Sequence, residues 1–324
     1  MRADVCIASR AARRGVRAAR LATDRTWPVG RILSRSQRSA RWICRDDGGG
    51  QAARAMLRPI LGDRSPIGLQ AMTIDFIRLS AIEVMAVGLL YFATLYVAAA
   101  VVTLLLTRGL LPSLGLGRRL DMHALGPGQL RRELALSTSS VLIFGLGLIV
   151  PWGLLQLGWA RLAPQPGAFR IVLEFALLLV WNELHFYASH RLLHTRPLRR
   201  FHAHHHRSIV TTPWSTYSFH PVEALLLGSV PLLPMLVHDF SFAALAALPV
   251  LSIALNSIGH SNYSFIAAES PAVTHSPSYR HHRHHVSYHG NYGFLLSVFD
   301  RWFGTALPPA DDSRPPAVAA EGPA

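Results

Sequence analysis

The chain contains a run of uncharged residues that is long enough to cross a membrane. Residues 84–106 are uncharged and mainly apolar, and a helix of this length, rising about 1.5 Å per residue, spans a hydrocarbon core of roughly 30 Å. Only 15% of all residues are charged, whereas soluble domains average about 25%. Both observations predict an integral membrane protein built from α-helices.

Further apolar segments follow this run. Residues 134–160 predict a second span, interrupted near Pro151, and residues 171 to about 190 predict a third. The two shorter runs at 222–238 and 241–258 predict a helical hairpin that crosses or re-enters the membrane and then returns. We therefore expect about four transmembrane helices.

The arginines predict how these helices are oriented. Outside residues 1–71 they are concentrated in the loop at 108–132 and in the segment at 191–207, and arginine-rich loops tend to stay in the cytoplasm. Two predicted crossings separate these segments, which places both on the same side. We expect a protein of a bacterial inner membrane whose functional site faces the cytoplasm.

Residues 1–71 differ in composition from the rest, with 15 arginines and 5 aspartates in a chain of net charge +14. They fit a targeting peptide, a basic arm for nucleic acid or anionic lipid, or untranslated sequence before a start at Met56 or Met72. The expected organisation is a disordered extension over 1–71, a membrane domain over 72–305 and a disordered tail over 306–324. Because the excess charge lies mainly in the extension, no nucleic-acid partner is expected.

Histidines are concentrated in the second half of the chain, where sixteen of the 17 lie between His185 and His289. Imidazole is the commonest side-chain metal ligand and is largely neutral near pH 7. Eight of these residues form one HxxxH and two HxxHH clusters: His190, His194, His202, His205, His206, His281, His284 and His285. Residues four apart share a helix face and can bind one ion. Eight ligands are too many for one ion and suit two.

The residue types narrow the choice of metal. Imidazole suits zinc, copper, iron and nickel. A structural zinc site usually includes cysteine, but the only two cysteines lie within residues 1–71, and the zinc-protease motif HExxH does not occur. Two redox-active irons that bind oxygen fit better. The alternative is a histidine-rich membrane protein that binds or transports metal without oxygenase activity.

Further motifs accompany the histidine clusters: FHPVEAL at 219–225, GHSNY at 259–263, NYG at 291–293 and FDRWFGT at 299–305. In this order, the motifs of residues 129–305 resemble those of the fatty acid hydroxylase/sterol desaturase superfamily. The stretch TTPWSTYSFHP at 211–221 is most similar to the sterol C5-desaturase branch.

This resemblance implies an all-α membrane protein with a cytoplasmic, histidine-rich helical cap that holds a dinuclear metal site. Members of the superfamily use two non-haem iron ions, for which zinc can substitute in a purified sample, together with O2 and an external electron donor. They hydroxylate or desaturate a lipid, either sterol-like or fatty acyl. The implied partners are this lipid, the membrane and an electron-transfer protein such as a cytochrome, ferredoxin or reductase.

The resemblance also assigns roles to single residues. It implies that the eight clustered histidines are metal ligands, with His220 and His260 as a ninth and a tenth. Glu183 lies seven residues before the first cluster, where it either orients a ligand or pairs with a nearby arginine. Asp300 and Arg301 are expected to form a structural ion pair that anchors the end of the cap.

Overall fold

The computed structural model describes residues 76–164, 166–266 and 276–308. The extension predicted at 1–71 and most of the tail predicted at 306–324 lie outside these residues. The described residues are mainly helical, as the sequence predicts, and include one short antiparallel strand pair, in which β1 (Arg118–Arg119) pairs with β2 (Tyr263–Ser264).

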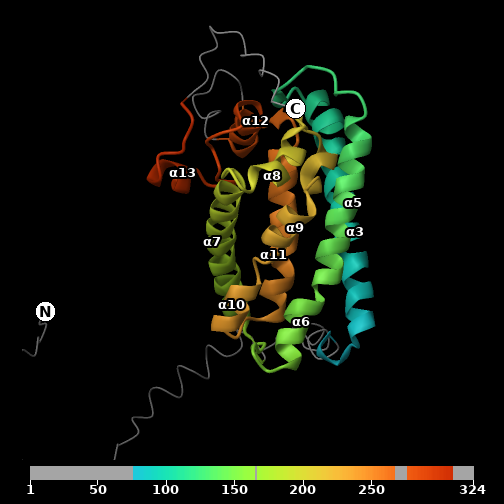
Figure 1. Cartoon of the computed structure of the whole chain (residues 1–324), viewed down its shortest axis with the longest axis vertical. Helices are drawn as coiled ribbons and strands as arrows, with labels where there is room; N and C mark the ends of the chain where they lie inside the picture. Colours follow the sequence, from blue (N-terminus) through green and yellow to red (C-terminus); the bar gives the residue numbers. More distant parts are fainter. Residues whose placement is uncertain (1–75, 165, 267–275, 309–324) are drawn as a thin grey trace, which may run out of the picture. The chain divides into compact units, whose positions relative to one another are not determined.

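Four helical segments are long and apolar enough to cross a membrane (Figure 1). The first comprises α3 (Ala81–Leu104), the π-helical η1 (Leu105–Leu110) and α4 (Leu111–Ser113). The second comprises α5 (Gln129–Gly147) and α6 (Ile149–Gln156), the third is α7 (Ala168–Leu193), and the fourth is α11 (Phe242–Gly259). These segments confirm the predicted integral membrane protein with about four spans.

The first span is longer than the apolar run suggests, because helical hydrogen bonding continues past residue 106 through η1 into the polar loop. A shorter apolar pair, α9 (Pro221–Gly228) and α10 (Leu232–Val237), precedes α11. Figure 1 shows α10 at the end of the bundle opposite α8 and α12, from which α11 returns. The predicted hairpin therefore crosses the bundle.

Small and polar side chains hold the spans together. Gly88 of α3 packs against Gly145 of α5 so closely that a Cβ on Gly88 would overlap the Gly145 carbonyl oxygen. Helices in lipid gain most of their association energy from such close packing and from interhelical hydrogen bonds. One such bond runs from Thr212 Oγ1 to the buried Glu133 carboxylate (2.6 Å). It fixes the segment before η2 (Pro213–Tyr217) to α5.

Three short helices form a cap at one end of the bundle: α8 (Arg199–His206), α12 (Pro277–Ser287) and α13 (Val298–Trp302) (Figure 1). The carboxy-terminal ends of α7 and α11 reach the same end, which brings distant parts of the chain together. This arrangement is the histidine-rich helical cap that the resemblance implies.

Asp300 anchors this cap in a different way from the one predicted. Instead of an ion pair with the exposed Arg301, the buried carboxylate accepts hydrogen bonds from the backbone N–H groups of Tyr292 and Gly293 (both 2.8 Å) and from Thr305 Oγ1 (2.7 Å). A buried carboxylate needs several donors to offset its lost hydration, and the backbone of this turn supplies them.

Candidate metal centre

Nine histidines converge in the cap as two groups. The five-histidine group consists of His190, His194, His202, His206 and His284, and the four-histidine group consists of His205, His260, His281 and His285. Within each group, the candidate ligand atoms all lie within 4.8 Å of one another. Eight of these side chains are buried, and His194 is half-buried.

Helix geometry explains how one cluster serves both groups. Successive residues of an α-helix point about 100° apart, whereas residues four apart share a face. On α8, His206 therefore points into the five-histidine group and its neighbour His205 into the other. On α12, His284 and His285 are divided in the same way. The HxxHH spacing thus lets one helix contribute to two metal sites.

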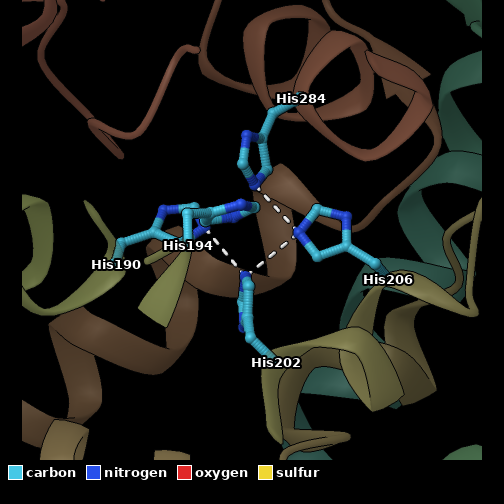
Figure 2. A group of neighbouring side chains, drawn as sticks. All are labelled: His190, His194, His202, His206 and His284. Carbon is cyan, nitrogen blue, oxygen red and sulfur yellow. Dashed lines mark hydrogen bonds between the residues drawn. The ribbon is translucent and has the colours of Figure 1, made fainter. Parts of the chain in front are cut away.

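In both groups the Nε2 atoms point toward one another, as Figure 2 shows for the five-histidine group. The Nε2 atoms are separated by 3.1 Å between His190 and His202 and by 3.0 Å from His206 to His202 and to His284. In the four-histidine group, His260 Nε2 lies 3.1 Å from His205 Nε2 and 3.0 Å from His281 Nε2, and the last pair, His281 and His285, is 3.1 Å apart.

The opposite ring nitrogens show that these short separations are not ordinary hydrogen bonds. His190 Nδ1 faces the Tyr292 carbonyl oxygen at 2.9 Å, and His260 Nδ1 faces that of Asn256 at 2.8 Å. Since a carbonyl oxygen only accepts, each Nδ1 must carry the proton. A neutral ring then presents a bare lone pair at Nε2.

His205 and His284 follow the same pattern, with Nδ1 facing the carbonyl oxygens of Ser218 (3.3 Å) and Gly290 (2.7 Å). The lone pairs of His205 and His260 therefore face each other at 3.1 Å, which is repulsive unless a cation lies between them. Two nitrogens that each lie about 2.1 Å from one metal ion are separated by about 3.0–3.4 Å. The donor set of each group is thus compatible with a metal ion.

Burial keeps the cap histidines neutral. Loss of hydration lowers the pKa of His194 to about 3 and that of His260 to about 4. The same effect, followed by repulsion from neighbouring histidines, holds the pKa of His206, His281 and His285 well below the ordinary value. Metal binding near neutral pH therefore requires no proton release from these rings.

The structure identifies one functional candidate that the sequence interpretation missed. Glu223 Oε1 accepts a hydrogen bond from His202 Nδ1 at 2.8 Å, and both side chains are only 2% exposed. A carboxylate in this position orients a ligating histidine and raises its basicity. The sequence signal that could have identified Glu223 is its position as an acidic residue at the start of the otherwise apolar α9, one turn after His220.

Two candidates from the sequence lie outside both groups. His220 is the N-cap of α9, where its Nδ1 accepts a hydrogen bond from the Val222 backbone N–H (3.2 Å). Glu183 belongs to neither group, and its carboxylate accepts hydrogen bonds from the backbone N–H groups of Leu295 and Leu296 (3.0 and 2.9 Å). It pairs with this turn, rather than with an arginine side chain.

A small cavity adjoins both groups and has room for about one water-sized molecule. Histidines of both groups line it, together with apolar side chains of α7, α9 and the preceding loop, including Phe186, Phe219 and Leu227. Glu223 also lines this cavity, and its Oε2 has no hydrogen-bond partner among the described residues. The cavity therefore joins a polar, metal-binding wall to an apolar one.

Comparisons with known proteins agree with this arrangement. The profile of the fatty acid hydroxylase family matches residues 175–305, which include all nine histidines. Delta(7)-sterol 5(6)-desaturases of Candida glabrata and Saccharomyces cerevisiae are each 27% identical to the chain, over 56% of it and 51% of the relative. The chain is thus similar to members of the fatty acid hydroxylase/sterol desaturase superfamily over the region that carries the histidine groups.

These matches confirm the resemblance, including that to the sterol desaturase branch. A third superfamily member, a Delta(7)-sterol 5(6)-desaturase of Aspergillus fumigatus, is 31% identical over 139 residues, covering 41% of this chain and 39% of the relative. The matched region spans about half the length of the first two relatives. No solved structure matches the chain significantly.

Proposed function

We propose that this protein hydroxylates or desaturates a lipid at the membrane, using O2 and two iron ions held by the nine converging histidines. The observation that carries the proposal is the inward orientation of the Nε2 lone pairs in two adjacent groups. The five-histidine group would hold one ion and the four-histidine group the other. His220, which caps α9, is not among the proposed ligands.

The iron ions would activate O2 for attack on an unreactive C–H bond. The role of the protein in this chemistry is to orient the ligands, position one substrate carbon and exclude water. Hydrogen bonds from Nδ1 to carbonyl oxygens and to Glu223 fix the orientation of the rings. The cavity offers a place for the reacting carbon, because its apolar wall of Phe186, Phe219 and Leu227 lies beside the histidines.

Hydroxylation converts R–H, O2, two electrons and two protons into R–OH and water, whereas desaturation removes two hydrogen atoms from the substrate and forms two waters. Both reactions require two electrons from an external protein such as a cytochrome, ferredoxin or reductase. The substrate is a sterol-like or fatty acyl lipid. The Delta(7)-sterol 5(6)-desaturases among the relatives favour the sterol-like class.

We also propose that the cap faces the cytoplasm. Its supporting observation is the arginine-rich sequence of the connections at this end of the bundle. The bacterial inner membrane stays a prediction from the sequence, since the relatives reported above are fungal.

The test combines metal analysis with lipid mass spectrometry in cells that express the gene or lack it. We expect about two irons per chain and a lipid that gains one oxygen atom or loses two hydrogen atoms only when the gene is present. His205→Ala should abolish the product. The matched control is His204→Ala in the same cluster, which should retain the product. The half-buried His204 ring faces the Arg200 carbonyl oxygen and the His220 ring and belongs to neither histidine group.

Three results would contradict the proposal. Product formed without O2 would exclude an oxygenase, and product retained by His205→Ala would exclude the assigned ligands. Metal flux that depends on His205, without any lipid product, would instead support the alternative of a metal-binding or transport protein.

A further inference from the structure

Tyr288 has a backbone conformation that is unusual for a bulky residue. It ends α12 in the left-handed region, with φ 60° and ψ 10°. Glycine or asparagine normally occupies such a position, because a large side chain there is strained. Strained residues of this kind concentrate at functional sites, so the tyrosine side chain needs an explanation beyond helix termination.

The side chain of Tyr288 covers the edge of the five-histidine group. Its ring centroid lies 4.4 Å from that of His206 and 5.1 Å from that of His194. Tyr288 is 36% exposed, and His194 is the one half-buried residue among the nine histidines. This edge is therefore where the group comes closest to solvent through a chain of aromatic rings.

A segment rich in arginine adjoins this edge. The connector between His194 and His202 carries three exposed arginines, which we call the arginine connector: Arg196, Arg199 and Arg200. Tyr288 donates a hydrogen bond from its hydroxyl to the Arg199 carbonyl oxygen (3.3 Å), which joins the aromatic edge to the connector.

No exposed carboxylate offsets these charges among the described residues of the cap. Those of Glu183, Glu223 and Asp300 are each 1% exposed and are hydrogen-bonded internally. The acidic side chains of the described cap residues thus lie inside, whereas the arginine connector lies outside. Such an asymmetric surface attracts a partner of opposite charge and speeds its association.

We propose that the arginine connector forms the docking surface for a soluble, acidic one-electron carrier protein, and that electrons enter the five-histidine group through the neighbouring Tyr288. This inference rests on the proposed function, which requires two external electrons per turnover. The reduced carrier loses one electron to the metal centre in each of two encounters. The two protons that the reaction consumes come from water.

An acidic protein explains the arrangement better than anionic lipid does. Lipid headgroups would account for exposed arginines, but they would not account for a strained, exposed aromatic ring packed on two candidate ligands. Electron transfer needs both features at one place: charge to hold the carrier and a short aromatic path to the metal.

The first test measures binding of an acidic [2Fe–2S] ferredoxin to the iron-loaded full chain in phosphatidylcholine nanodiscs. Charge reversal by Arg196→Glu with Arg199→Glu should raise the dissociation constant at low salt by about tenfold or more, and should flatten its dependence on salt. Arg199 is the first residue of α8, where an acidic side chain is favourable for a helix, so folding should persist.

Arg161→Glu is the matched control, because Arg161 is exposed in the loop after α6, at the end of the bundle opposite the cap. It should leave ferredoxin binding unchanged. Equal binding by the native protein and the double variant would overturn the proposal. Loss of ferredoxin binding when the nanodiscs contain phosphatidylglycerol would also overturn the proposal, because that result would assign the arginines to lipid headgroups.

The second test uses Tyr288→Gly and Tyr288→Phe. Glycine suits the left-handed backbone, so this variant should fold and bind ferredoxin normally. Under argon, however, the oxidised metal centre of Tyr288→Gly should reoxidise bound reduced ferredoxin at least about tenfold more slowly than that of the native protein. Tyr288→Phe keeps the ring and should remain near the native rate. Equal rates for glycine and phenylalanine would overturn the role of Tyr288.

A chemical reductant separates this inference from the proposed function. Dithionite with methyl viologen bypasses protein docking and should give equal product in one turnover from the native protein and from the arginine double variant. The docking surface is supported if the arginine double variant loses product when ferredoxin supplies the electrons but not when dithionite does. Absence of product from the native protein with dithionite would instead contradict the proposed oxygenase.

Discussion

Replacing Glu223 with glutamine tests whether this carboxylate supports the metal centre. The substitution keeps the shape of the side chain but removes the negative charge that faces His202 Nδ1 at 2.8 Å. Because both side chains are 2% exposed, water cannot replace the lost interaction. A hydrogen bond to a charged group contributes about 1.5–3 kcal/mol. At about 1.4 kcal/mol per factor of ten, this corresponds to a loss of about ten- to hundredfold in metal affinity.

The glutamine oxygen can still accept the His202 proton, so we expect a loss toward the lower end of this range. The weakened site should be the five-histidine group, since the ring nitrogen that donates to Glu223 belongs to His202 of that group. Dialysis of the iron-loaded protein against graded concentrations of chelator, followed by metal analysis, should show one iron released at lower chelator concentration and the other retained.

Glu133→Gln is the matched control. Glu133 is another fully buried carboxylate on a membrane helix, but its hydrogen bonds come from Gln129 and Thr212. This variant should release both irons at the native chelator concentration. If Glu223→Gln and Glu133→Gln release iron identically, the inferred role of Glu223 in supporting His202 is wrong.

Three further outcomes follow from other contacts. Acid should destabilise the metal-free protein. In the folded protein the pKa is lowered to about 3 at His194 and about 4 at His260, so below about pH 6.5 the unfolded chain binds more protons than the folded protein does. Its melting temperature in detergent should therefore fall steadily from pH 7 to pH 5, and a constant value would refute this linkage. Glu183→Gln should weaken iron retention less than Glu223→Gln does, because Glu183 holds only the turn at 295–296; an equal loss in the chelator assay would show a more direct role. Gly88→Val should sharply reduce the yield of folded protein in size-exclusion chromatography, since the added side chain overlaps the Gly145 backbone; a native yield would show that α3 and α5 can separate without harm.

Local periodicity made most of the fold predictable. An apolar run long enough to span lipid has few alternatives to a helix, so the spans could be placed from the sequence. Spacings of three and four residues determine which side chains share a helix face, so the two HxxHH clusters indicated metal binding. The division of each cluster between two groups depends on how α8 and α12 pack, which no local pattern specifies.

The positions of the other candidate residues depend on tertiary contacts in the same way. His220 and His260 both flank helices near the clusters, but His260 ends α11 with its ring directed inward, while His220 begins α9 and caps it. Glu183 lies two helical turns before His190 on α7, but its carboxylate accepts hydrogen bonds from the backbone of the turn at 295–296. Glu223 is far from His202 in sequence and reaches it only because α9 crosses beneath α8.

Under the proposed function, the buried carboxylates share one role, which is to offset the charge of the metal ions. Nine neutral imidazoles contribute no charge, so two ferrous ions would place four positive charges in a buried site, at a large cost in hydration energy. Glu223 contacts a candidate ligand directly, and Asp300 holds the backbone of Tyr292, whose carbonyl oxygen orients His190. Glu223 and Asp300 thus place acidic groups behind two candidate ligands without occupying a coordination position that O2 needs. The arginines can then remain at the surface, where they are free to attract a partner.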